Sequence, residues 1–181
     1  MHRQNLLKAL KLYSHRFPSE TAETTRFILF VENYPDCFER SLQIGHVTGS
    51  AWIVNQANSH ALFTHHRKLG RWLQLGGHAD GEANVQNVAL REAREESGLI
   101  ELCLLEEAIF DIDIHLIPAR KREPEHYHYD VRYLIQATGT EQLQVSDESN
   151  ELAWFDLAEI KARMADESIL RMARKWHQNM H

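Results

Sequence analysis

The sequence has little cysteine, no surplus of basic residues and no long apolar run, and each absence excludes a class of protein. Its two cysteines, Cys37 and Cys103, have neither paired nor C-x-x-C spacing, so nothing indicates a disulfide framework. A net charge of -6 leaves no basic surplus for binding the phosphates of a nucleic-acid polymer. No apolar run approaches the roughly 18 residues of a membrane span. The N-terminus precedes an amphipathic helix rather than a signal-peptide core, so we expect a cytoplasmic location and no membrane partner.

What remains is the composition of a globular protein, with 181 residues of which 43% are hydrophobic and 25% are charged. This length fits a single domain over residues 1–181. Helical spacing of apolar residues predicts an N-terminal helical extension over residues 1–40. From residue 46 onward the period changes to two, which predicts strands over 47–54 and 61–66 and begins a core that runs to residue 181.

The stretch from Gly76 to Leu99 carries the most distinctive pattern in the chain. Two glycines open a tight loop, about a dozen residues of helical pattern follow, and Gly98 supplies a helix C-cap. One face of this helix changes from apolar to acidic halfway along, and its members in order are Val85, Val88, Ala89, Glu92 and Glu96, with Glu95 beside them. Carboxylates at this spacing repel one another, so a positive partner must compensate them.

Two kinds of positive partner for these carboxylates are consistent with the sequence. On an exposed helix the glutamates would pair with Arg91 and Arg94, which is common and contributes little stability. The helical wheel, however, places both arginines away from the acidic stripe. Three carboxylates facing a glycine-rich loop instead favour a hard divalent cation with oxygen ligands, Mg²⁺ or Mn²⁺.

The same segment resembles the Nudix box, G-x5-E-x7-R-E-U-x-E-E-x-G-U, where U is an aliphatic residue. Gly77 falls on the opening glycine, and residues 91–99 match the closing half, with Ala93 small for an aliphatic position. One departure is Ala83, where the pattern has glutamate and Glu82 stands next to it. A second departure is Leu75, where many family members carry proline.

The resemblance implies an α/β/α sandwich with a mixed β-sheet. It also implies hydrolysis of a pyrophosphate bond in a nucleoside diphosphate linked to another moiety, by attack of a metal-activated water on phosphorus. The implied metal ligands, to Mg²⁺ or Mn²⁺, are Glu92, Glu95, Glu96 and the backbone carbonyl of Gly76. The implied catalytic residues are Arg91, which would orient the glutamates, Glu95, and Glu148, which would act as base or additional ligand, with Glu151 as second choice.

Polar residues outside the box predict contacts to the substrate. Alternation places His115 on the polar face of a strand over 111–115, and His126, His128 and Asp130 on the polar face of the next strand. Two histidines and an aspartate could form a transition-metal site, but residues two apart on a strand are roughly 6–7 Å apart and rarely converge on one ion. We therefore expect a polar pocket wall. Arg71, in a basic loop before the glycines, would meet pyrophosphate charge, unless that loop is merely solvated.

A second function remains open, because some Nudix-like domains bind nucleotide-like ligands without cleaving them, as sensors or regulators. Ala83 favours that alternative, whereas the complete set of predicted metal ligands favours catalysis. In either case we expect a small nucleotide-type molecule as partner. The oligomeric state stays open, with a homodimer among the arrangements because Nudix proteins are frequently dimers. The N-terminal helices would pack on the sheet, or serve as a dimer interface or substrate lid.

Overall fold

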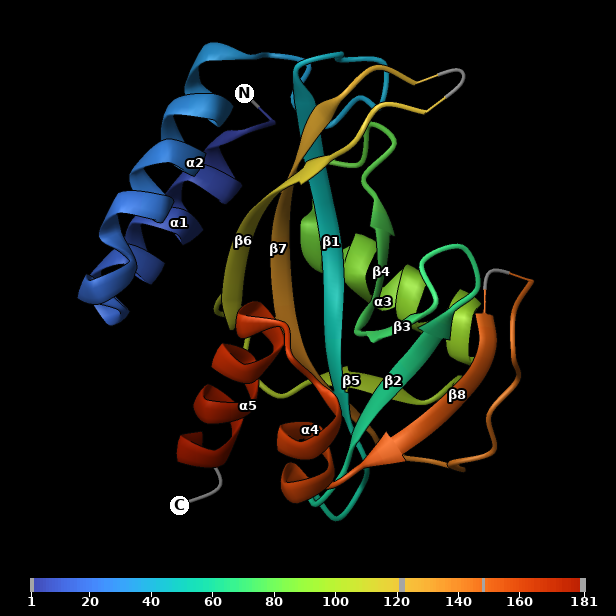
Figure 1. The fold of residues 1–181 in the computed structure, drawn as a ribbon. Coiled ribbons are helices and arrows are strands. Elements are labelled where there is room, and N and C mark those ends of the chain that lie inside the picture. The colour runs from blue at the N-terminus through green and yellow to red at the C-terminus, as the bar shows by residue number, and fades with distance from the viewer. Residues whose placement is uncertain (1, 121–122, 148, 180–181) are drawn as a thin grey trace.

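A computed structural model describes residues 2–120, 123–147 and 149–179 and shows a mixed sheet between helices, which confirms the expected α/β/α class (Figure 1). The strands are β1 (Gly45–Val54), β2 (Ala61–His66), β3 (Arg71–Leu73), β4 (Leu75–His78), β5 (Leu102–Leu104), β6 (Asp111–Ile117), β7 (His126–Ala137) and β8 (Ser149–Phe155). The helices are α1 (Gln4–Arg16), the short 3-10 helix η1 (Pro18–Glu20), α2 (Thr21–Asn33), α3 (Val85–Ser97), α4 (Leu157–Arg163) and α5 (Glu167–Asn179). None of the described helices is both long and apolar enough to cross a membrane.

Strand β1 is the centre of the sheet, and all of its residues are buried. It pairs in parallel with β7 over its whole length, from Gly45 opposite Tyr127 to Val54 opposite Gln136. Its other edge pairs antiparallel with β4 and, at Val54, with β2. The sheet order is β3-β2-β1-β7-β5, while β6 pairs with β7 and β8 with β2. A parallel central pair needs a crossover, and the chain between β1 and β7 supplies it with α3.

Two apolar cores cover the two faces of the sheet. On one face, a side chain added at Gly49 of β1 would meet Val85 and Val88 of α3, so odd-numbered β1 residues face α3. Helices α1 and α2 join the same core, where the ring of Phe30 stacks on Tyr129 of β7 with centroids 3.6 Å apart. On the other face α4 and α5 cover a core that includes Trp52, Phe63 and Trp176. The N-terminal helices thus pack on the sheet, one of the roles expected for them.

Several local features depend on neighbours in sequence, and the predicted C-cap at Gly98 is confirmed among them. Helix α3 ends at Gly98, which adopts the left-handed conformation with φ 73°. Asp156 caps α4 in a capping box with Glu159. On α5, apolar residues at helical spacing, among them Met172 and Trp176, form the buried face.

Two predictions about backbone structure are wrong. Gly76 and Gly77 do not form a tight loop but lie in β4, opposite Ser50 and Gly49 of β1. The sharp turn comes later, at Asp80 and Gly81, which have φ of 48° and 86°. The apolar-rich residues over 102–110 predict one strand, but a strand forms only over Leu102–Leu104, because the chain leaves the edge of β7 after Leu105 and rejoins it as β6.

Candidate active site

The glycine pair of β4 lies directly against the acidic half of α3. A Cβ on Gly77 would collide with the carboxylate of Glu92, and a Cβ on Gly76 would collide with Ser50 of β1. The backbone N–H of Gly76 donates to Glu96 Oε1 at 3.2 Å. Position 76 therefore requires glycine because β1 passes too close for a side chain, whereas glycine at position 77 leaves room for the carboxylate of Glu92.

Arg91 links α3 to β4. Its Nη2 donates to Glu92 Oε1 at 2.7 Å and to the carbonyl oxygen of His78 at 2.8 Å. The hydrogen bond to Glu92 is the main reason why the pKa of Arg91 lies above its ordinary value. The helical wheel had placed Arg91 away from the acidic stripe, and that placement is wrong for the guanidinium, because its long flexible side chain reaches back to the adjacent residue.

The remaining acidic side chains of this region differ in position. Glu95 is exposed, whereas Glu92 and Glu96 are half-buried beside β4. Among the described residues, Glu92, Glu95 and Glu96 do not form a group in which one carboxylate oxygen of each lies within 4.8 Å of the other two. Glu82 is also exposed, and its Oε1 accepts from the backbone N–H of Asn84 at 2.7 Å. Glu82 therefore stabilises the start of α3 instead of reaching the glycine pair.

The predicted loop carboxylate cannot be placed. Glu148 lies outside the described residues, so its role as base or ligand stays a prediction. The second choice, Glu151, is exposed on β8 and pairs across the strand with His65 of β2.

Arg71 and His115 both have acidic partners on the protein. Arg71, at the start of β3, lies 3.6 Å from Asp166 at a groove formed with the segment between α4 and α5. The ring of His115 on β6 is 3.0 Å from Asp113 and remains partly exposed. Whether either side chain contacts a substrate stays a prediction.

Asp130 does not line an open pocket as expected. Its side chain is 3% exposed, and its Oδ1 accepts from the hydroxyls of Thr48 and Ser50, each at 2.8 Å. Its Oδ2 accepts from Arg132 Nε at 2.8 Å. A substrate could reach Asp130 only by displacing these donors, because the parallel pairing of β1 with β7 encloses the carboxylate.

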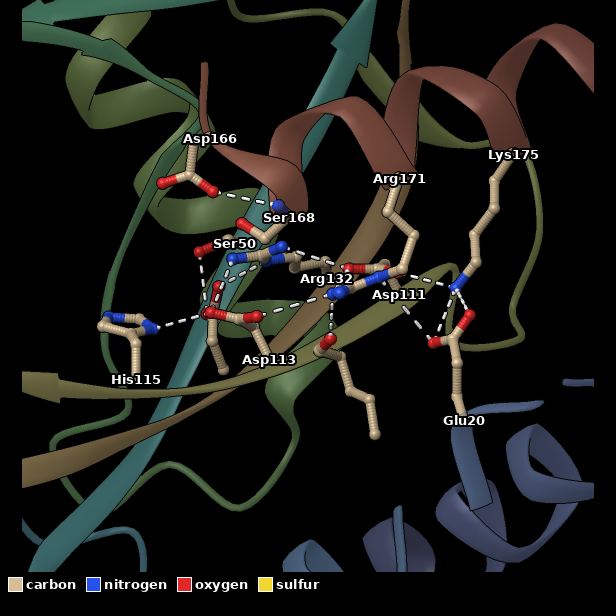
Figure 2. Close-up of polar contacts among 12 residues, drawn as sticks. Glu20, Ser50, Asp111, Asp113, His115, Arg132, Asp166, Ser168, Arg171 and Lys175 are labelled. Carbon is tan, nitrogen blue, oxygen red and sulfur yellow. Dashed lines mark hydrogen bonds and ion pairs between the residues drawn. The ribbon is translucent and has the colours of Figure 1, made fainter. Parts of the chain in front are cut away.

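Arg132 belongs to a buried ionic cluster that joins the sheet to α5 (Figure 2). Asp111, which is fully buried, accepts from Arg132 at 3.1 Å, from Arg171 at 2.8 Å and from Lys175 at 2.6 Å. Burial by itself raises the pKa of Asp111, but the hydrogen bond from Arg171 and the nearby positive charges outweigh it and hold the pKa below its ordinary value. Sequence alternation placed Asp111 on a polar face but gave no sign of its cationic partners.

His126 and His128 lie in a group of histidines that sequence reasoning did not assemble. The ring of His128 on β7 is 4.9 Å from that of His46 on β1 and 5.1 Å from that of His78 on β4. His126 is 4.9 Å from His46, and its Nδ1 is 2.8 Å from the carbonyl of Pro124. Burial, followed by neighbouring histidines, lowers the pKa of His46 to about 4 and that of His128 to about 2, so both rings are neutral at pH 7.

Comparisons with known proteins agree with this architecture. No curated protein matches the chain. An Ap4A hydrolase of C. elegans, solved as a binary complex, is 17% identical with a TM-score of 0.59 over 74% of this chain and 97% of that chain. A NUDIX-family hydrolase from Clostridium perfringens is 22% identical with a TM-score of 0.58 over the same shares. The E. coli dihydroneopterin triphosphate pyrophosphohydrolase is 14% identical with a TM-score of 0.56 over 74% of this chain and 95% of that chain.

At these identities the solved structures establish a shared fold. The family comparison goes further, because a model described as the NUDIX domain matches residues 46–175. That span begins where the sequence pattern changed from helices to strands, and it contains the glycine pair and the acidic half of α3. Since it covers well over half of the chain, this protein belongs to the Nudix family.

Proposed function

We propose that this protein is a metal-dependent hydrolase that cleaves a pyrophosphate bond in a nucleoside diphosphate linked to another moiety. Membership of the Nudix family supports a hydrolase acting on pyrophosphate bonds. The single observation that carries the proposal is the close approach of Glu92 and Glu96 to the glycine pair of β4. Half-buried carboxylates collected at such a place commonly mark function.

The donor set fits a hard divalent cation. Glu92 and Glu96 supply carboxylate oxygens, and Gly76 adds a backbone carbonyl. The carboxylate of Glu95, on the same helix, is exposed to solvent. All of these are oxygen donors, which Mg²⁺ and Mn²⁺ prefer. When bound, such an ion neutralises phosphate charge and lowers the pKa of a coordinated water.

The protein's own groups position these carboxylates. Arg91 holds Glu92 by a hydrogen bond and ties it to the backbone of His78, while the N–H of Gly76 holds Glu96. Both carboxylates are therefore held beside β4. We assign Glu148 the role of proton acceptor or additional ligand, and we assign Arg71, His115 and His126 to contacts with the non-reacting part of the substrate.

A hydrolysis screen tests the proposal. The purified protein is offered nucleoside triphosphates, nucleotide sugars, ADP-ribose, Ap4A and dihydroneopterin triphosphate with Mg²⁺ or Mn²⁺, and the products are separated by chromatography. We expect one class to be cleaved and the Glu96→Gln variant to lose about 100-fold or more in kcat/KM. Glu32→Gln, an exposed change on α2, is the matched control and should behave as wild type. Equal rates for both variants would refute the site.

Ala83 supports a second function, a nucleotide-binding module without catalysis. The side chain that stands where the Nudix pattern has glutamate instead packs on the apolar core, and Glu82 is engaged with Asn84. For such a module we expect no cleavage across the panel, together with thermal stabilisation by one ligand class. The Ala83→Glu variant separates the two functions, because a marked gain in rate would identify an attenuated enzyme.

A further inference from the structure

Three strands bring three imidazole rings to one point on the sheet. His46 is the second residue of β1 and lies directly opposite His128 of β7 in the parallel register, and His78 ends β4 opposite Thr48 of β1. The ring centroids of the three histidines lie 4.9–5.1 Å apart. One nitrogen from each ring lies within 4.8 Å of the other two.

These rings contain buried polar atoms that the fold leaves unpaired. His46 is 3% exposed, and its ring nitrogens make no well-formed hydrogen bond among the described residues, although the backbone of Leu42 lies near enough to interact with the ring. The Nε2 atom of His128 is buried and also lacks a partner there. Burying a polar atom without a partner costs free energy, so such atoms usually have a role. His46 and His128 both belong to the group in which one nitrogen of each ring lies close to one nitrogen of His78.

The cluster is separated from the carboxylates of α3 by the sheet itself. Gly49 and Gly77 face α3, as their near contacts with Val88 and Glu92 show. Since side chains alternate along a strand, His46 and His78 point to the opposite face. One connection between the two runs through the backbone, because the carbonyl of His78 accepts from Arg91.

We propose that His46, His78 and His128 form a second metal site, which binds Zn²⁺ through three imidazole nitrogens. Nitrogen donors suit zinc and its transition-metal neighbours rather than the hard ions that carboxylates prefer. Zn–N bonds of about 2.0–2.1 Å in a tetrahedron place the nitrogens about 3.3 Å apart, which small ring rotations reach from the present arrangement. The fourth position is left to water, and the ion ties β1, β4 and β7 together.

Metal binding by the stripped protein tests this site without any measurement of hydrolysis. The full chain, freed of metal by a chelator, is titrated with Zn²⁺ against a chromophoric chelator, and with Co²⁺ while its visible absorption is recorded. We expect one equivalent of Zn²⁺ to bind and Co²⁺ to give the spectrum of a low-coordinate nitrogen site. The His46→Ala and His128→Asn variants should bind Zn²⁺ at least about 100-fold more weakly.

Two controls keep the outcome decisive. His65→Gln, on β2 and outside the cluster, and Glu96→Gln, in the carboxylate site, should both keep wild-type affinity for Zn²⁺. Circular dichroism checks folding, and the half-buried His78→Gln is the variant to rely on if His46→Ala does not fold. Absence of tight Zn²⁺ binding by the wild type overturns the proposal. So does equal binding by the wild type and the cluster variants, since the ion would then sit elsewhere.

Discussion

Replacing Asp111 with asparagine removes the central charge of the buried cluster while keeping its shape. The carboxylate of Asp111 contacts Arg132 on β7 and both Arg171 and Lys175 on α5. It is fully buried, so no solvent can take over the role of the lost charge. An asparagine amide would also turn hydrogen-bond donors toward cations.

The expected loss of unfolding free energy depends on which acidic partners the three cations keep. Breaking a buried ion pair by removing one partner costs about 3–5 kcal/mol, because the other charge is left uncompensated. Lys175 and Arg171 would still have Glu20, and Arg132 would still have Asp130, so the lower limit of about 3 kcal/mol applies. For a chain of this size each 1 kcal/mol shifts Tm by about 2–4 °C, which gives a fall of about 6–12 °C.

Urea unfolding followed by tryptophan fluorescence measures this loss, since Trp176 is buried on α5 and its ring lies 6.0 Å from that of the buried Trp52. Glu106→Gln is the matched control, because it breaks the partly exposed pair with Arg16 and should cost no more than about 1 kcal/mol. If Asp111→Asn were as stable as that control, the cluster would not be what holds α5 to the sheet.

Three further predictions follow from other contacts. Gly77→Ala should lower the hydrolysis rate about 100-fold with unchanged circular dichroism, because the new Cβ displaces the carboxylate of Glu92; an unaltered rate would contradict the site geometry. Burial raises the pKa of Asp113, but the hydrogen bond with its histidine neighbour and nearby arginines outweigh it and lower the pKa to about 2. Its stabilising effect is therefore present above about pH 4 and lost as the pH falls toward 2, so the unfolding free energy of Asp113→Asn should fall less steeply than that of wild type over this range. Asp156→Ala should cost about 1 kcal/mol in a urea melt by removing the cap of α4, and a loss below a few tenths would show that the capping box adds little.

The sequence by itself determined the features that depend on near neighbours along the chain. Helical periodicity and Gly98 predicted α3 and its end, and strict alternation predicted a strand over 111–115 and a second strand that begins at His126. The Nudix box predicted the family, because its closing half is a dense local pattern. Each of these is set by local backbone preference or by side-chain spacing within about a dozen residues.

Only the tertiary structure decided which polar residues meet. Asp130 and His128 belong to one polar strand face, yet the parallel register of β1 buries Asp130 against Thr48, 82 positions away, and brings His128 to His46. Likewise, position 76 needs glycine only because β1 passes beside it. Such contacts depend on how distant segments cross over and pair. The alternation of residues along one strand does not indicate which other strand pairs with it.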